Sequence, residues 1–337
     1  MTRLEQLQRT GIQRLGNPSR GFRYRRAGDR VSAADLKRID ELRIPPAWTN
    51  VWINSTPGGA VQAIGTDAAG RLQYLYHQNH VRRQDARKFR RVIKFAEALP
   101  KMRTTVATNL REPDLGRDSV MAAILRILSS CFIRPGSHVY ANENGSFGIA
   151  TLRPRHVKVK GDLVEFDFPG KSGVRQFRQI KDHKVAKVVR SLLKRPSREV
   201  FKYQNGNGEF VNVTRSHINS YIREVMGESF SAKDFRTWAG TLVCACALAR
   251  VGTDHSEKPT ARKRKIVEAI KETAAALGNT PAVCRSSYIC PQIINNFEAG
   301  KIIDHYFNSL QALITYRGKK LHAAEKSLLG FMKRMAA

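Results

Sequence analysis

The stretch LGNTPAVCRSSYICP, Leu277 to Pro291, decides how the second half of the chain folds. Gly278 follows an apolar helical pattern and is expected to end that helix, because glycine readily adopts the left-handed conformation common at helix C-termini. Thr280 is expected to cap a new helix, with the following proline at its first position. Arg285 and Tyr288 are then predicted to share one helix face. Tyr288 is either a packing residue or a reactive one. If it reacts, Arg285 cannot be its base, because an arginine can stabilise a negative charge but cannot accept a proton.

A reactive Tyr288 needs either a base or a target that reacts without one. The ordinary tyrosine pKa of about 10 leaves roughly 0.1% phenolate at pH 7. Attack on a carbonyl would require a base, whereas attack on a phosphodiester mainly requires cations around a doubly negative transition state. Arg134 and Arg236 stand at an expected helix end and helix start, and Lys171 lies in a glycine-rich turn where it could protonate a leaving oxygen. These residues permit phosphoryl transfer without a metal cluster.

The composition indicates a nucleic-acid partner. The chain has 59 Lys and Arg against 28 Asp and Glu, a formal net charge of +31. That excess is the sign expected of a protein that binds a polyanion. With 337 residues, of which 42% are hydrophobic, the chain can bury a sizeable core. We expect no transmembrane helix, since no run of about 18 apolar residues occurs, and we expect the five cysteines to be reduced core thiols in an intracellular protein.

The pattern of elements predicts two domains, 1–80 and 81–337. Residues 47–76 contain short β-favouring runs separated by Pro-Gly and Asp-Ala-Ala-Gly turns, which indicate an antiparallel sheet. From His80 the apolar residues recur with helical spacing. Strand-like runs fill 147–180, with Lys171 at the tip of a hairpin. The other expected helices are one that starts at Asp118 or Ser119, and 182–194, 214–226, 231–250 and 261–277, followed by small basic helices over 297–337.

A resemblance to a known family follows from fragments in a fixed order. FIRPGSHVYANENGSFGIATLRPRHVKV, FPGKSG, SAKDFRTWAGT and LGNTPAVCRSSYICP resemble the catalytic domain of the compact bacterial and poxvirus-like type IB DNA topoisomerases. IPPAWTNVWI and GTDAAGRLQYLYH resemble their N-terminal DNA-clamping domain. The resemblance implies an α+β protein: a small β-rich N-terminal domain, and a mostly α-helical catalytic domain of the tyrosine recombinase and topoisomerase IB type with a β-hairpin insertion.

The resemblance also implies roles for single residues. Tyr288 corresponds to the nucleophile that forms a 3′-phosphotyrosyl bond, and Asn279 stands where many members carry a histidine that donates to a phosphate oxygen. An amide can donate that bond but cannot become charged near neutral pH. The remaining implied roles are phosphate clamps for Arg134 and Arg236, general acid for Lys171, an assisting lysine for Lys233, and DNA contacts for Gln73, Tyr74, Tyr76 and Tyr140. Each residue alone has an ordinary structural explanation, and their ordered co-occurrence favours catalysis.

The resemblance implies that the protein relaxes supercoiled duplex DNA by cleaving and religating one strand. It further implies a monomer in the bacterial cytoplasm, at the nucleoid, that needs neither ATP nor a metal. Two alternatives remain open at this point. A site-specific tyrosine recombinase shares the chemistry, but such enzymes typically have histidine where this chain has Lys233. A non-catalytic architectural DNA binder would explain the charge but not the placed arginines, lysines and tyrosine.

Overall fold

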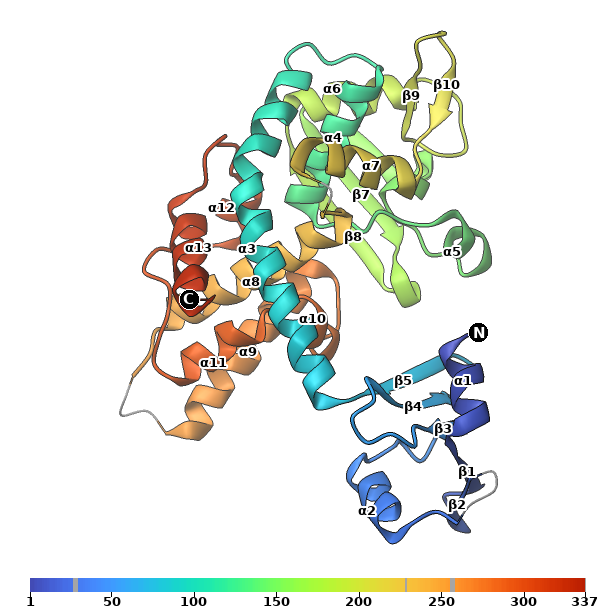
Figure 1. Cartoon of the computed structure of the whole chain (residues 1–337). Helices are drawn as coiled ribbons and strands as arrows, with labels where there is room; N and C mark the ends of the chain where they lie inside the picture. Colours follow the sequence, from blue (N-terminus) through green and yellow to red (C-terminus); the bar gives the residue numbers. More distant parts are fainter. Residues whose placement is uncertain (27–29, 228, 255–257, 337) are drawn as a thin grey trace. The chain divides into compact units, whose positions relative to one another are not determined.

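The computed structural model describes residues 1–26, 30–227, 229–254 and 258–336. The chain forms two compact units, Met1–Arg87 and Lys88–Ala337. The division falls inside helix α3 (Gln78–Asn109), whereas the sequence places it after residue 80. Figure 1 shows that α3 continues from the β-rich N-terminal unit into the helical second unit.

The first unit is built on a five-stranded antiparallel sheet in the order β2-β1-β3-β4-β5. Ile12, Ile53 and Ala63 are fully buried in its core together with Ile39 of α2. The sheet expected over 47–76 is confirmed, and the structure adds two strands and two helices before it. The elements are α1 (Arg3–Thr10), β1 (Ile12–Asn17), β2 (Gly21–Arg26), α2 (Ala33–Glu41), β3 (Thr49–Ile53), β4 (Val61–Thr66) and β5 (Leu72–Tyr76).

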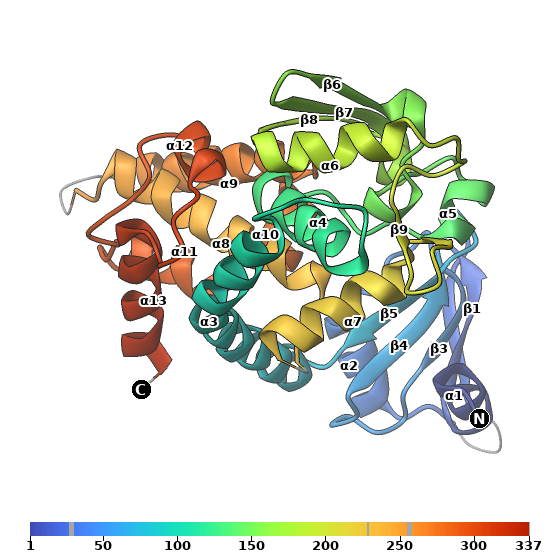
Figure 2. The same cartoon turned by 90° about the horizontal axis from the view of Figure 1, so that it is seen from above.

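The second unit packs helices around a continuous apolar core that includes most of helix α8 (Ala232–Val251). Its three-stranded sheet β6-β7-β8 lies alongside helix α6 (His183–Leu193), as Figure 2 shows. The other elements are α4 (Arg117–Cys131), α5 (His138–Glu143), β6 (Val157–Lys160), β7 (Leu163–Pro169), β8 (Arg175–Lys181), β9 (Lys202–Gln204), β10 (Phe210–Asn212), α7 (Arg215–Met226), α9 (Pro259–Leu277), α10 (Pro281–Ser287), α11 (Pro291–Glu298), α12 (Leu310–Thr315) and α13 (Ala323–Ala336).

Most helix ends follow from the sequence. Thr214 and Thr280 cap α7 and α10, and Ser231 forms a capping box with Asp234 at the start of α8, all as predicted. Gly278 ends α9 with φ of 60°, also as predicted. Two expectations were wrong. Helix α4 begins at Arg117 with Gly116 as its N-cap. Asp118 and Ser119, the expected N-caps, lie inside its first turn. Arg285 and Tyr288 do not share a face of α10, because this helix ends at Ser287 and leaves Tyr288 as its C-cap.

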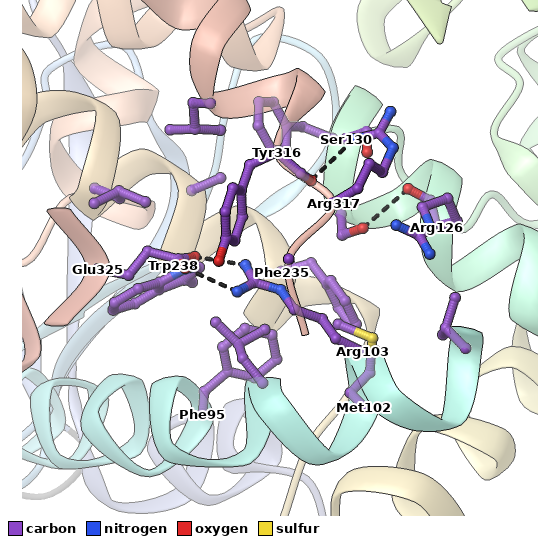
Figure 3. A pocket seen from close by; sticks show the side chains of 18 of the residues that line it. Phe95, Met102, Arg103, Arg126, Ser130, Phe235, Trp238, Tyr316, Arg317 and Glu325 are labelled. Atoms are coloured by element: carbon purple, nitrogen blue, oxygen red, sulfur yellow. Dashed lines mark hydrogen bonds and ion pairs between the residues drawn. The ribbon is translucent and has the colours of Figure 1, made fainter. Parts of the chain in front are cut away.

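Helix α8 presents different residues on its two faces. Phe235 and Trp238 line a small cavity between α3, α4, α8 and the C-terminal segment, where Arg103 forms an ion pair with Glu325 (Figure 3). Arg236 and Gly240 lie on the opposite face, which packs toward α9, α10 and the Tyr288 segment. Helix α8 therefore connects the apolar core with the candidate site.

The five cysteines are buried free thiols, as predicted. Across the described residues, no helix is both long and apolar enough to cross a membrane.

Candidate active site

The main chain of Tyr288 is fixed against helix α8. A Cβ atom added to Gly240 would come within 2.9 Å of the Tyr288 carbonyl oxygen, so only glycine permits this approach. The hydroxyl of Thr241, which is fully buried, shares its proton between the carbonyl oxygen of Thr237 at 2.8 Å and that of Tyr288 at 3.2 Å, and it accepts from the backbone N–H of Cys290 at 3.3 Å. From α3, the ammonium group of Lys88 donates to the carbonyl oxygen of Ile289 at 3.2 Å. The tyrosine backbone is thus held by α8 and α3 together.

Arg236 lies against the ring of Tyr288. Its guanidinium carbon is 4.8 Å from the ring centroid, and 3% of the residue is exposed. Nη1 donates to the carbonyl oxygen of Phe132, and Nη2 donates to that of Leu277 at 3.0 Å. Burial, reinforced by the charge of Arg134, lowers the pKa of Arg236 to about 10. The cation is therefore held by main-chain oxygens rather than by a carboxylate.

Arg134 and Asn279 form the other side of the site. Nη2 of Arg134 donates to Oδ1 of Asn279, which fixes the orientation of the amide because an arginine cannot accept a hydrogen bond. Nδ2 of Asn279 is then buried with no hydrogen-bond partner in the described structure. Nε of Arg236 is a second buried donor without a hydrogen-bond partner in the described structure. Unpaired buried donors are unfavourable, and both would be satisfied by an anion in the site.

The environment favours ionisation of Tyr288. Burial, the largest single influence, raises the pKa of the phenol, but the combined charge and hydrogen bonding of Arg236 and Arg134 outweigh it. The net result is a pKa below the ordinary value of 10. In place of a neighbouring base, two cations increase the phenolate fraction. Arg285, the arginine nearest in sequence, is exposed and is not part of this arrangement.

Lys233 lies exposed in the first turn of α8, next to a firmly held acid. The carboxylate of Asp234 accepts two hydrogen bonds from Arg91 of α3, one of them at 2.6 Å, and also closes the capping box with Ser231. The side chain of Lys233 makes no hydrogen bond or ion pair with the described residues. The first turn of α8 is therefore anchored to α3 through Asp234, while the ammonium group of Lys233 faces solvent.

Lys171 lies in the turn between β7 and β8, as predicted for the tip of a hairpin. Ser172 and Gly173 in this turn have φ of 62° and 73°, and the lysine is exposed. The described contacts do not join Lys171 to Tyr288. The structure thus brings together Tyr288, Arg134, Arg236 and Asn279, and leaves both lysines in solvent.

The candidate DNA contacts of the first unit divide between two faces of β5. Tyr74 and Tyr76 are each 40% exposed, with ring centroids 6.2 Å apart, and His80 stacks on Tyr76 at 5.2 Å. Gln73 lies on the other face, where its amide donates to Asp67 at 2.8 Å. In the second unit, Tyr140 is 58% exposed on helix α5. The structure therefore offers an exposed aromatic pair on one face of β5 and Gln73 on the other.

Comparison with known proteins gives consistent matches along the chain. A sequence model of the catalytic core of eukaryotic DNA topoisomerase I matches residues 77–307, and a model of the N-terminal domain of bacterial DNA topoisomerase IB matches residues 21–67. The DNA topoisomerase 1B of Acanthamoeba polyphaga mimivirus is 35% identical over 270 residues, which cover 77% of this chain and 79% of the viral protein. The DNA topoisomerase 1B of Vaccinia virus (strain Copenhagen) is 23% identical over 244 residues, 72% and 74% of the two chains.

The chain belongs to the type IB DNA topoisomerases. It is therefore an isomerase of DNA topology, and the matches favour neither the recombinase nor the non-catalytic binder. Within this topoisomerase, the contacts of Gly240, Thr241, Lys88 and Arg91 were not predicted from the sequence. A sequence signal was present for Gly240, because an isolated glycine inside a helical pattern is unfavourable for the helix and can mark a packing requirement.

We predict that Tyr288 ionises below pH 10 in the free protein, and that Arg134→Ala raises its pKa by removing a positive charge. NMR titration of ¹³C-labelled tyrosine, with Tyr288→Phe as the assignment, measures both values. Tyr221 is an internal control, because burial raises its pKa to about 12 even though Asn109 donates to its hydroxyl. A Tyr288 pKa at or above 10, or one that does not rise in Arg134→Ala, would contradict the arrangement.

Proposed function

We propose that Tyr288 of this topoisomerase attacks a phosphodiester of duplex DNA and forms a 3′-phosphotyrosyl bond. This role is supported by the position of the phenol. Its ring packs against the guanidinium of Arg236, the charge of Arg134 also acts on its pKa, and the same site contains the unpaired amide donor of Asn279. A cationic site with free donors and no carboxylate in its described part is suited to a phosphate. The remaining roles follow from the steps of the reaction.

In the cleavage step, Tyr288 reacts as the phenolate after releasing its proton to water; its oxygen bonds to phosphorus, and the bond from phosphorus to the 5′-oxygen breaks. The transition state carries two negative charges, which Arg134 and Arg236 stabilise with their planar forks, while Nδ2 of Asn279 donates to a non-bridging oxygen. Lys171 gives its proton to the leaving 5′-oxygen, and Lys233 assists that transfer. The reverse attack by the 5′-hydroxyl religates the strand after the duplex has rotated.

Because the phosphotyrosyl ester conserves the energy of the broken diester bond, religation needs no nucleotide. The arginines supply the charge stabilisation that a divalent cation would otherwise give. We therefore propose relaxation that is independent of ATP and metal. The test is relaxation of a supercoiled plasmid in EDTA without nucleotide, by protein at a concentration where light scattering reports a monomer. No relaxation under these conditions would reject the proposal.

We also propose that residues 1–80 form a DNA-clamping domain and that residues 81–337 form a catalytic domain of the tyrosine recombinase and topoisomerase IB type, in which β7 and β8 are the hairpin insertion. The exposed pair Tyr74 and Tyr76 and the net charge of +31 support contact with duplex DNA. Tyr140 is proposed as a further contact. A protein acting on the chromosome would work in the bacterial cytoplasm, at the nucleoid.

Tyr288→Phe is expected to abolish both plasmid relaxation and covalent DNA linkage while leaving duplex affinity nearly unchanged, since the change removes one oxygen atom. Denaturing the enzyme on supercoiled plasmid should give a nicked, protein-linked species for wild type and none for the variant. Tyr306→Phe, a partly exposed tyrosine in the same unit, is the matched control and should behave as wild type. Residual linkage above a few percent in Tyr288→Phe would place the nucleophile elsewhere.

Lys171→Ala tests proton donation separately from charge. The variant should cleave ordinary DNA about 10²-fold more slowly or worse, the usual contribution of a general acid. On a strand with a 5′-bridging phosphorothiolate, the thiolate leaves without a proton, so the variant should approach the wild-type rate. An equal defect on both substrates would reduce Lys171 to a phosphate contact.

Tyr74→Ala and Tyr76→Ala should weaken duplex binding without changing how binding depends on salt. Each neutralised phosphate contributes about −0.9 to the slope of log K against log[salt], and an aromatic contact contributes nothing to it. Filter binding of a 30-base-pair duplex at several salt concentrations gives both quantities. Gln73→Ala, on the opposite face of β5, is the comparison. A loss of affinity for Gln73→Ala with none for the tyrosines would place the DNA on the other face.

A further inference from the structure

Arg178, on strand β8, is a third arginine near Arg134 and Arg236. The residue is partly buried, and it donates from Nη1 to the carbonyl oxygen of Phe177 at 3.0 Å and from Nη2 to Oε1 of Gln176 at 3.2 Å. Both acceptors are uncharged. No carboxylate of the described chain pairs with Arg178. Burial lowers its pKa, and the charge of Arg134 acts in the same direction.

The guanidinium of Arg178 packs against the turn that carries Asn279. A Cβ atom added to Gly278 would lie 2.7 Å from Nη2 of Arg178 and 2.1 Å from Oε1 of Gln176. Asn279 follows directly and accepts a hydrogen bond from Arg134. Arg178 therefore approaches the site from the hairpin and lies against the turn that carries Asn279.

Three guanidinium groups close together without an acid are electrostatically unfavourable. A buried charge normally has a partner, because an unpaired charge loses its hydration without compensation. Arg134 and Arg178 both act on the pKa of Arg236, so the three charges share one region. Among the described residues, no carboxylate pairs with any of the three arginines. The Tyr288 phenol acts on the charge of Arg236 but is the proposed nucleophile, so a bound phosphate is the anion that would balance them.

We propose that Arg178 is a further catalytic residue of the cleavage reaction, whose guanidinium acts directly on a non-bridging oxygen of the scissile phosphate. Of its five N–H donors, two have neutral acceptors in the structure, which leaves donors for a phosphate. Asn279 contributes a dipole, and Arg178 adds a full charge next to the turn that carries Asn279. The inference rests on the proposed function, because it assigns a third arginine to the same phosphate.

The first experiment compares Arg178→Gln with Arg175→Gln in single-turnover cleavage of a suicide duplex. Arg175 lies on the same strand, but its side chain is 76% exposed and paired with Asp167, so it is a matched control. We expect cleavage by Arg178→Gln to be about 10–10² times slower, with duplex Kd changed less than threefold, and Arg175→Gln to match wild type. A change confined to Kd, or an equal loss in the control, overturns the proposal.

The second experiment separates direct action on the phosphate from support of the Gly278 turn. Replacing one non-bridging oxygen of the scissile phosphate by a methyl group removes the charge and the acceptor that Arg178 serves. On one of the two methylphosphonate diastereomers, the rate ratio of wild type to Arg178→Gln should fall toward one. A ratio that stays the same on both diastereomers means that Arg178 only supports the turn, and overturns the proposal.

The wild-type enzyme separates the two levels of inference. If wild type forms no covalent DNA linkage, the proposed function fails; if wild type links DNA and Arg178→Gln cleaves equally fast, the inference about Arg178 alone fails. Should Arg178→Gln unfold, as a loss of its thermal transition would show, Arg178→Lys takes its place. That variant should cleave about 3–10 times slower and show the same recovery on one diastereomer. Absence of that recovery overturns the proposal.

Discussion

The candidate site depends on a buried arginine that is held by helix ends instead of by an acid. Arg236 donates to the carbonyl oxygen of Phe132, the C-cap of α4, and to that of Leu277, the last residue of α9. Carbonyl groups at a helix C-terminus carry partial negative charge and have no partner within the helix. These carbonyl groups offset part of the desolvation cost of the buried guanidinium. Because they carry no full negative charge, the positive charge of Arg236 remains available to a ligand. A carboxylate at the same place would neutralise it.

This constraint determines the backbone around the site. Phe132 has φ of 54°, an uncommon conformation for a bulky side chain, and this geometry occurs where its carbonyl oxygen receives Nη1 of Arg236. Gly278, with φ of 60°, turns the chain directly after Leu277 and leaves space for Gln176 and Arg178. The two helix ends, the hairpin strand and the Tyr288 segment thus all pack around one guanidinium. Arg236 belongs to α8, and the apolar face of this helix is packed into the core of the second unit.

Local sequence signals predicted the parts of this arrangement that depend on local chemistry. The caps at Thr280 and Ser231, the helix end at Gly278 and the hairpin turn at Lys171 each need a particular residue at a particular position, and all are present. The contacts of Arg178 and Thr241 could not be predicted, because they join residues far apart in the chain. The first two strands were missed, since β2 alternates basic and aromatic residues without a buried apolar face.

The arrangement separates the two requirements of phosphoryl transfer. Arg134, Arg236 and Asn279 are positioned by buried contacts before any DNA is present, so the part of the site that receives the anion is preorganised. Lys171 and Lys233 are exposed and have no such contacts. Under the proposed function, phosphate binding therefore requires little rearrangement, whereas protonation of the leaving oxygen requires the lysines to move to it. On that proposal, the free enzyme holds a preorganised anion site and an incomplete proton-transfer site, and bound DNA would complete the second.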